Sequence, residues 1–330
     1  MRVACIRAHG GLEALRHEDW PDPAPGPGQA LVEVRACGLN HLDLFVIKGM
    51  AGVDIEFPRI TGGDIAGMVS ATFSPDDRAW IGRRVLVDPL VVEGRKRMAL
   101  GEHKNGGLCE RLCVPVGNLI ALPEDVSLER AAALPIAYGT AHKMLGPGRG
   151  DLKRGETLLV LGATGGVGVA SVQLGKLMGA HVIACTSSAE KAAKLVALGA
   201  DAVIDTSREE FSAAAWRLTD KQGADVVVNF TGGETWVPSL RALKRLGRVL
   251  VCGATAGYDP VEDLRYLWMR EAAIIGSNGW ERENLTALLD LAAGGALSPV
   301  IDRVVPLAET ASALAALRDR RVFGKVLVTP

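Results

Sequence analysis

The stretch from Cys37 to Phe45, CGLNHLDLF, gathers side chains that can bind a metal or transfer a proton. Cys37, Asn40, His41 and Asp43 lie within seven positions of a segment that is otherwise apolar. A catalytic zinc ion takes three protein ligands that offer nitrogen, sulfur or carboxylate oxygen. The stretch is therefore a zinc site, the remnant of one, or ordinary packing. Residues elsewhere in the chain distinguish these three interpretations.

A second set of metal-binding side chains consists of His103, Cys109 and Cys113. Residues four apart on a strand are separated by about 13 Å, at a rise of ~3.3 Å per residue. The ligands of one zinc ion lie only about 2.3 Å from the metal. We therefore interpret these cysteines as core residues.

Length and composition limit the functions that the chain can have. A chain of 330 residues predicts about two domains. The net charge of −1 gives no general attraction to nucleic acid or to an anionic membrane, and no apolar run is long enough to span a bilayer. The six cysteines are scattered, and the first residues contain no signal-peptide core. These features predict a cytoplasmic protein that acts on a small molecule.

The hydrophobic pattern changes along the chain. Residues 1 to about 125 hold short alternating runs such as ALVEVRA, residues 30–36, broken by Pro and Gly. This pattern is typical of a β-rich, barrel-like unit. From about residue 150, apolar strands alternate with helical segments, including 211–218 and 236–246, which predicts a parallel sheet covered on both faces. The last sixty residues hold helices at 283–293 and 308–318 and a final strand, KVLVTP, which return to the first domain.

The strongest motif is VLGATGGVG, Val160 to Gly168. It ends a predicted strand, opens a predicted helix, and matches G-x-G-x-x-G with Ala163 in place of the first glycine. Glycine permits a tight turn and lets backbone amides approach a pyrophosphate at the start of the helix. The flanking strand and helix favour a dinucleotide site over a simple tight turn.

The end of the next strand indicates which dinucleotide binds. An acidic residue there would hold the 2′-hydroxyl of NAD, but the sequence is CTSSAEK, with Thr186 at this place. The absence of a carboxylate favours NADP. Ser187 and Glu190 also fit a capping box, which needs no ligand. Lys191 would oppose the helix dipole in that interpretation, and a nearby phosphate would compensate for it.

With these motifs in order, the chain resembles the medium-chain dehydrogenase/reductase superfamily from end to end. The matching stretches are PGPGQALVEVRACGLNHLDLF, GGDIAG, NGGLCERLCVP, AAALPIAYGTAH, GATGGVG, LGADAVID, GRVLVCGATAG and FGKVLVTP. The resemblance implies an α/β protein with a doubly wound Rossmann domain at 128–273. It also implies a discontinuous GroES-like β-barrel catalytic domain at 1–127 and 274–330. It further implies a homodimer joined by Rossmann edge strands, for which AAIIGS, Ala272 to Ser277, is the candidate.

The zinc-dependent branch of this superfamily places catalytic ligands at three positions. This chain has Asn40, Gly63 and Ala132 there, and none of these side chains is a suitable ligand. The lobe that carries the structural zinc cysteines is replaced by DPLVVEGRKRMALGEHKN, which has no cysteine. The stretch CGLNHLDLF instead resembles the zinc-free quinone oxidoreductase and enoyl reductase branch, with G-x-N-x-x-D at this point. We therefore expect no zinc.

The resemblance also implies the site residues. Asn40 and Thr140 would lie beside nicotinamide and substrate, with Asn40 donating to the carbonyl. His41 is a candidate proton donor because histidine titrates near neutrality, and Tyr138 is a candidate acid. Structural roles for each remain the alternative. The residues implied for cofactor binding are Thr164, Gly165, Gly166, Val167, Gly168, Thr186, Ser187, Lys191, Phe230, Thr231, Cys252, Gly253, Ala254, Asn278 and Lys325.

The reaction implied is hydride transfer from NADPH to the β-carbon of a quinone or α,β-unsaturated carbonyl, without zinc. Two alternatives stay open. One is an alcohol dehydrogenase with an unusual metal set such as Cys37, His41 and Asp64. The other is an NADPH-binding protein that has lost catalysis. One departure weakens the NADP prediction: where quinone reductases often have V-I-N-Y, this chain has VIDT, residues 203–206, with Arg208 as a substitute partner for phosphate.

Overall fold

The computed structural model describes residues 1–50 and 52–330, which form two compact units. The first unit comprises Met1–Ala137 and Leu285–Pro330, and the second comprises Tyr138–Asn284. These boundaries differ from the expected ones, after residue 127 and after residue 273, and each difference has a physical reason. The helix that follows residue 127 packs on strands of the first unit, and the strand that contains residues 273 and 274 belongs to the sheet of the second.

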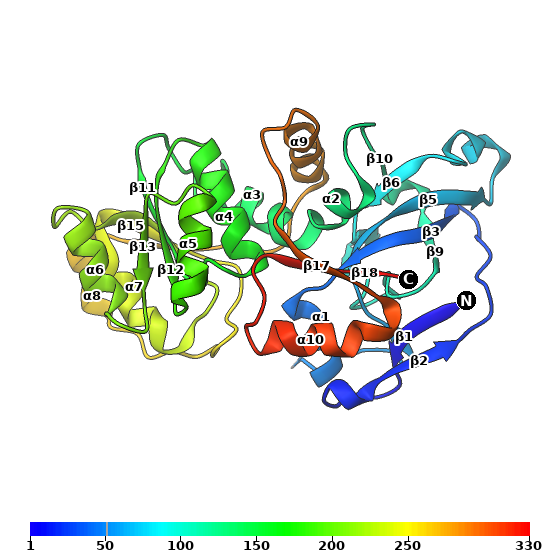
Figure 1. The fold of residues 1–330 in the computed structure, drawn as a ribbon, viewed down its shortest axis with the longest axis horizontal. Coiled ribbons are helices and arrows are strands. Elements are labelled where there is room, and N and C mark those ends of the chain that lie inside the picture. Colours follow the sequence, from blue (N-terminus) through cyan, green and yellow to red (C-terminus); the bar gives the residue numbers. More distant parts are fainter. Residues whose placement is uncertain (51) are drawn as a thin grey trace. The chain divides into compact units, whose positions relative to one another are not determined.

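The first unit is built from β-sheets (Figure 1). Its largest sheet has the order β10-β6-β5-β3-β18-β17, and β9 also pairs with β3. A three-stranded sheet, β2-β1-β4, and the hairpin β7-β8 complete it. The strands are β1 (Arg2–Ile6), β2 (Leu15–Asp19), β3 (Gln29–Gly38), β4 (Arg59–Ile60), β5 (Asp64–Thr72), β6 (Arg84–Val87), β7 (Leu90–Glu93), β8 (Lys96–Ala99), β9 (Arg111–Pro115), β10 (Leu119–Ala121), β17 (Ile301–Pro306) and β18 (Lys325–Thr329).

The C-terminal strand returns to the first unit, as the sequence predicts. β18 pairs antiparallel with β3, with Leu327 opposite Gly38, and Figure 1 shows the two strands side by side. β5 lies on the other side of β3, with Asp64 opposite the same Gly38. Helices cover the sheets: α1 (His41–Lys48), α2 (Leu128–Ala132), α9 (Arg282–Ala293, its first three residues in the second unit) and α10 (Thr310–Arg318). Three distant segments of the chain thus converge at the carboxyl end of β3.

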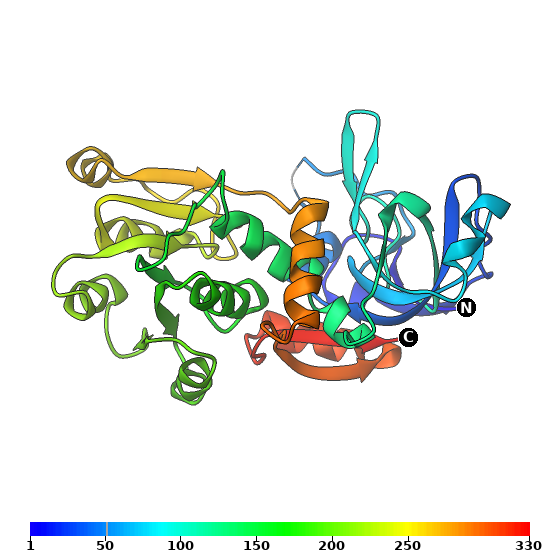
Figure 2. The same cartoon turned by 90° about the horizontal axis from the view of Figure 1, so that it is seen from above.

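The second unit is a six-stranded parallel sheet with the order β13-β12-β11-β14-β15-β16. Its strands are β11 (Thr157–Val160), β12 (His181–Thr186), β13 (Ala202–Asp205), β14 (Ala224–Val228), β15 (Leu243–Val251) and β16 (Ala273–Gly276). Its helices are α3 (Thr140–Leu145), α4 (Gly166–Leu177), α5 (Ala189–Ala197), α6 (Phe211–Leu218), α7 (Trp236–Ala242) and α8 (Leu264–Arg270). Helices α4 and α5 lie on one face and α6 and α7 on the other (Figures 1 and 2). This is the doubly wound Rossmann order, in which ligands bind where the strand order reverses, here between β11 and β14.

The predicted helix 236–246 is too long. The helix ends at Ala242, and Leu243 already pairs with Ala224 of β14. Sheet pairing overrides the local helical pattern of these residues.

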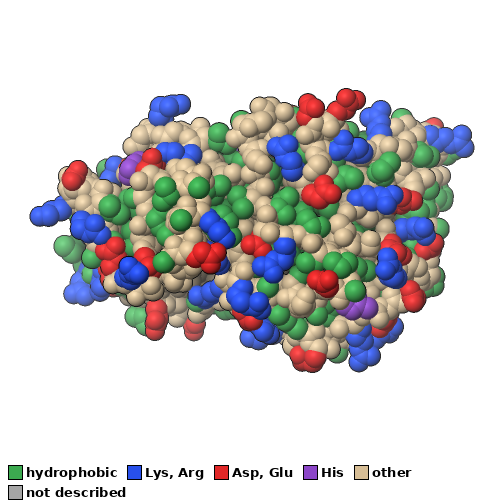
Figure 3. Space-filling model, in the orientation of Figure 1, with side chains coloured by type: hydrophobic (Ala, Val, Ile, Leu, Met, Phe, Trp, Pro, Cys, Tyr) green, Lys and Arg blue, Asp and Glu red, His purple; other side chains and the backbone are tan. Residues whose placement is uncertain are grey.

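The surface carries mixed charge. Lys, Arg, Asp and Glu side chains are interspersed on the face drawn in Figure 3, in keeping with the net charge of −1. Within the described part of the chain, no helix combines the length and the apolar character needed to cross a membrane.

Candidate functional site

The turn between β11 and α4 has the geometry of a phosphate-binding loop. Gly162 has a positive φ of 58°, which a residue with a side chain rarely adopts. A Cβ on Gly168 would lie 2.2 Å from the Gly162 carbonyl oxygen, so only glycine lets the helix pack this close to the strand. Gly165 at the N-cap has no side chain to accept from the first amides of α4, residues 166–168. These amides therefore suit an anion.

The carboxyl end of β12 carries hydroxyl groups where an acid would select NAD. Thr186 is buried, and its hydroxyl accepts from the Ser188 amide at 3.2 Å. The N-cap of α5 is Ser188, whose hydroxyl accepts from the Lys191 amide at 3.3 Å. The capping box predicted at Ser187 is therefore wrong by one residue. Ser187 is exposed and does not cap the helix, so its hydroxyl is available to bind a ligand.

An acid from the neighbouring strand lies at the same end. Asp205, the last residue of β13, pairs in register with Thr186. Its carboxylate accepts from the amide and hydroxyl of Ser207 and lies 3.4 Å from Arg208 Nε. The hydrogen bonds from Ser207, and then the charge of Arg208, hold the pKa of Asp205 below its ordinary value. The exposed guanidinium of Arg208 offsets this acid.

The remaining predicted cofactor residues of the second unit follow the carboxyl ends of β14, β15 and β16. Asn229 shapes the loop after β14, since its Oδ1 accepts from the amides of Thr231 at 2.9 Å and Gly232 at 3.0 Å. Cys252 follows β15, and burial raises the pKa of its thiol to about 12, so the sulfur is a protonated packing group. Asn278 is exposed just beyond β16. The fold thus brings these predicted residues to the carboxyl ends of the strands, where Rossmann folds bind their ligands.

In the first unit, three polar side chains meet at the carboxyl end of β3. Asn40 follows β3, Asp64 opens β5, and Lys325 opens β18. Lys325 Nζ lies 2.8 Å from Asp64 Oδ2 and 2.6 Å from Asn40 Oδ1, and Asn40 Nδ2 donates to Asp64 Oδ2 at 2.8 Å. The other oxygen of Asp64 accepts from the Ile136 amide at 2.7 Å. The cluster is closed, and all three side chains are buried.

Asp43 fixes the start of α1 beside this cluster. Its carboxylate accepts from the Asn40 amide at 2.7 Å and from the Gly62 amide at 2.8 Å. Burial raises its pKa to about 6, against the lowering effect of these two amides. Asp43 thus orients the backbone around Asn40 and Gly62 through these hydrogen bonds.

The four predicted catalytic residues fall into two groups: two have their hydrogen-bonding groups engaged within the described part of the chain, and two do not. Asn40 Nδ2 donates to Asp64 and, at 3.3 Å, to the Gly38 carbonyl, so both of its hydrogens are engaged. Tyr138 is fully buried and donates its hydroxyl proton to Gln173 Oε1 at 2.7 Å. In contrast, the His41 imidazole and the Thr140 hydroxyl make no hydrogen bond within residues 1–50 and 52–330. Burial and the charges of Arg320 and Lys325 lower the pKa of His41, which leaves the imidazole neutral near neutrality.

The comparisons with known proteins agree with this architecture. Residues 26–124 match the alcohol dehydrogenase GroES-like domain, and residues 166–294 match the zinc-binding dehydrogenase family. Acryloyl-coenzyme A reductase from Metallosphaera sedula is 32% identical over 100% of both chains. Quinone oxidoreductase-like protein 2 from Bos taurus is 29% identical over 92% of this chain and 85% of its own. The chain belongs to the medium-chain dehydrogenase/reductase superfamily.

Solved structures of this superfamily confirm the predicted fold class. The structure of an NAD-dependent alcohol dehydrogenase superposes with a TM-score of 0.93, at 34% identity over 100% of both chains. A 2-octenoyl-CoA carboxylase reductase, solved in complex with NADP and 2-octenoyl-CoA, superposes with a TM-score of 0.87. It is 27% identical and is matched over 99% of this chain and 87% of that one. The predicted Rossmann and GroES-like folds and the predicted superfamily are therefore confirmed.

The zinc of zinc-dependent medium-chain dehydrogenases does not fit the residues of this chain. Asn40, at the first ligand position, already binds the Lys325 ammonium through its amide oxygen at 2.6 Å, and a divalent cation there would be repelled by that ammonium. The alternative ligand set of Cys37, His41 and Asp64 fits a metal no better. Both oxygens of Asp64 are engaged, and burial raises the pKa of the Cys37 thiol well above its usual range.

The resemblance assigned Lys325 to the cofactor, and the structure gives it a different place. Its ammonium has three acceptors within the first unit: Leu39 O at 2.7 Å, Asn40 Oδ1 and Asp64 Oδ2. An ammonium group has three N–H donors, and all three are engaged. We therefore correct the cofactor assignment of Lys325 to a structural one.

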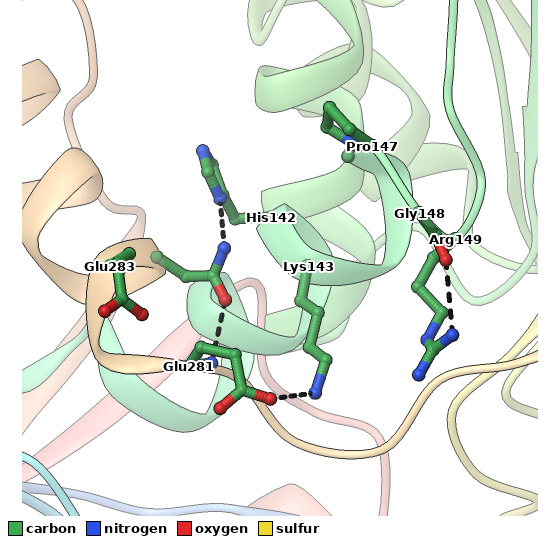
Figure 4. A pocket seen from close by; sticks show the side chains of 9 residues that line it. His142, Lys143, Pro147, Gly148, Arg149, Glu281 and Glu283 are labelled. Carbon is green, nitrogen blue, oxygen red and sulfur yellow. Dashed lines mark hydrogen bonds and ion pairs between the residues drawn. The ribbon is translucent and has the colours of Figure 1, made fainter.

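A cavity of about 380 Å³ in the second unit lies apart from the predicted site residues, none of which lines it. Figure 4 shows Lys143 and Glu281 paired across it, at 2.7 Å. Lys143 also donates to the Asn278 carbonyl at 3.1 Å, and His142 contacts Asn284 at 3.0 Å. The hydrogen bond from Lys143 thus holds the loop that carries Asn278.

Several residues of the site were missed by sequence reasoning. The sequence suggests Asp64 only as a metal ligand, and it predicts no role for Asn229 or Gln173. Asp64 had a usable signal, because an acid in the buried run GGDIAG needs a partner. Its cation, Lys325, lies 261 positions away, and one sequence contains no signal that pairs them.

Proposed function

We propose that this protein is an NADPH-dependent, zinc-independent reductase of carbon–carbon double bonds conjugated to a carbonyl, with enoyl-CoA thioesters as its substrate class. The observation that carries the proposal is the Asn40–Asp64–Lys325 cluster, where an ammonium binds the side chain that a zinc ion would need. The substrate class is supported by the similarity to acryloyl-coenzyme A reductase and 2-octenoyl-CoA carboxylase reductase.

The cofactor site is proposed from the second unit. The amides of Thr164 to Gly168 would hold the pyrophosphate, and the loops after β14, β15 and β16 would hold the ribose and nicotinamide. When bound, NADPH supplies the hydride. Ser187, Lys191 and Arg208 would recognise the 2′-phosphate, since the end of β12 has no carboxylate to bind a 2′-hydroxyl.

Hydride addition at the β-carbon places negative charge on the carbonyl oxygen, which needs a hydrogen-bond donor. We assign this donor to His41, whose neutral imidazole has no partner within residues 1–50 and 52–330 and keeps an N–H group to offer. Its position at the first residue of α1 disfavours the imidazolium further, because the start of a helix repels positive charge. Thr140, the first residue of α3, offers a hydroxyl to the carboxamide or the substrate. This revises the donor role first expected for Asn40.

Two other functions remain as test outcomes. An NAD-dependent alcohol dehydrogenase superposes closely, but alcohol oxidation also requires removal of the hydroxyl proton, which is hard without a Lewis acid or a placed base. A quinone is a second acceptor class, supported by the similarity to quinone oxidoreductase-like protein 2.

The test is an initial-rate comparison of chelator-treated protein. NADPH and NADH oxidation are followed with crotonyl-CoA, acryloyl-CoA and a benzoquinone, and NADP⁺ reduction is followed with a primary alcohol. We expect turnover of an enoyl-CoA with NADPH that survives chelation. Turnover of the quinone alone would support a reductase but would reject enoyl-CoA thioesters as its substrate class. Alcohol oxidation that requires added zinc would refute the proposal, and tight NADPH binding without turnover would indicate a catalytically inactive protein.

A further inference from the structure

Lys325 is a fully internal cation. Its side chain is 1% exposed and its partner Asp64 is 0% exposed. A buried ammonium is costly unless it is paired and fully hydrogen-bonded. Here the Asp64 carboxylate supplies the opposite charge, and Leu39 O and Asn40 Oδ1 supply the other two acceptors. The charge is thus fixed in one place and cannot move out to solvent.

This cation restrains the residue that precedes α1. Leu39 O and Asn40 Oδ1 are both acceptors of the ammonium, so Lys325 binds the chain on two consecutive residues. The amide of Asn40 is held separately by Asp43 at 2.7 Å. His41 is the next residue, and the orientation of its side chain depends on this anchored start of the helix.

We infer that Lys325 is a positioning residue: with Asp64, its ammonium locks Asn40 and thereby fixes the first turn of α1, from which His41 projects. The catalytic consequence rests on the proposed function, in which His41 donates to the carbonyl oxygen. Lys325 itself touches neither substrate nor cofactor. This role differs from the cofactor contact implied by the resemblance, and the two can be separated by measurement.

The charges around His41 are consistent with this role. Burial disfavours the charged form of the imidazole, and the charges of Arg320 and Lys325 add to this effect. Other charged groups on the elements that pack against or carry His41 are engaged or exposed: Asp43 binds two amides, Glu13 accepts from the Gly11 amide, Arg318 pairs with Asp319, and Lys48 is exposed at the end of α1. Removal of the Lys325 charge is therefore expected to make His41 easier to protonate.

The experiment compares Lys325→Met, which keeps side-chain length and removes the charge, with Lys48→Met, which removes an exposed charge from α1. Because Lys325→Met leaves the Asp64 carboxylate buried without its cation, the double variant Lys325→Met/Asp64→Asn is prepared in parallel. Three quantities are measured on the full chain: the His41 titration by NMR, the NADPH dissociation constant by nucleotide fluorescence, and kcat and KM with crotonyl-CoA.

We expect both Lys325 variants to raise the pKa of His41 and to lower kcat at least tenfold, with NADPH affinity within twofold of the parent. Lys48→Met should change none of these. An unchanged His41 titration would overturn the inference. A tenfold loss of NADPH affinity with an unchanged titration would restore Lys325 to the cofactor site. The titration needs no substrate, so a shifted His41 in a protein that reduces no enoyl-CoA would support the positioning role and refute the proposed function instead.

Discussion

Asp43 Oδ1 accepts a hydrogen bond from the Gly62 amide at 2.8 Å, which ties the first turn of α1 to the segment that leads into β5. The other carboxylate oxygen accepts from the Asn40 amide. A single buried carboxylate thus joins two of the three chain segments that supply the Asn40–Asp64–Lys325 cluster, those that carry Asn40 and Asp64. Its protonation state should affect the stability of the first unit.

Replacement of Asp43 by Asn should change the pH dependence of stability. The folded-state pKa of Asp43 is raised from 3.8 to about 6, chiefly by burial. Folding therefore takes up a proton between these values, and stability falls as pH rises through this window. The loss amounts to about 3 kcal/mol at 1.36 kcal/mol per pKa unit. Asp43→Asn cannot titrate, so urea unfolding should show the parent losing about this much relative to the variant between pH 4 and 6.5.

The control is Asp19→Asn, which removes an exposed carboxylate from β2. It should track the parent at every pH. A constant difference between the parent and Asp43→Asn across the range would contradict a raised pKa for Asp43.

Substitution of Gly168 by Ala should damage the phosphate-binding turn. The added methyl group would lie 2.2 Å from the Gly162 carbonyl oxygen and 2.7 Å from the Ala163 backbone, neither of which can move without distorting the turn. Overpacking of this kind costs about 1–3 kcal/mol. Calorimetry should show a Tm lowered by on the order of 5 °C, together with weaker NADPH binding.

Gly165→Ala provides the matched control for this turn. Its added Cβ would meet only the Gly162 carbonyl oxygen at 3.7 Å, an ordinary contact, and its backbone is extended. Its Tm should therefore remain near that of the parent. Equal thermal shifts in the two variants would show that Gly168 is not required for close packing.

Local patterns in the sequence predict the second unit well and the first-unit site poorly. The turn at Gly162–Gly168 and the alternation of strands and helices depend on local sequence, so a single sequence is enough to predict them. The Asn40–Asp64–Lys325 cluster depends on the register of β5 and β18 on β3, where Asp64 and Leu327 both lie opposite Gly38. Sequence spacing contains no information on that register.

The errors share this cause. The sequence predicts that Asn40 donates to substrate because it does not show the partners of this side chain. It predicts too long a helix from Trp236 because it does not show that Leu243 pairs with β14. The predicted capping box begins at Ser187, one residue too early, because Ser187 and Ser188 both suit an N-cap and local preference alone does not distinguish them.

The homodimer remains a prediction, and β16 provides its test. β16 is one of the two edge strands of the second-unit sheet, and Ile274 is 43% exposed there. An exposed apolar edge strand is a template for pairing with another chain. Ile274→Lys should convert a dimer to a monomer in sedimentation equilibrium, whereas Val304→Lys, an equally exposed residue of β17 in the first unit, should not. A monomeric parent would refute the prediction.

Cofactor preference should respond to one charge at the end of β12. Ser187 is exposed beside Thr186, where NAD-selective Rossmann folds carry an acid. Ser187→Asp would place a carboxylate near the proposed 2′-phosphate site, and repulsion should lower the NADPH-to-NADH ratio of kcat/KM at least tenfold, about 1.4 kcal/mol. Ser70→Asp adds the same charge to an exposed position of β5 and should leave the ratio unchanged. If Ser187→Asp also leaves it unchanged, the 2′-phosphate is recognised elsewhere and the assignment of Ser187, Lys191 and Arg208 fails.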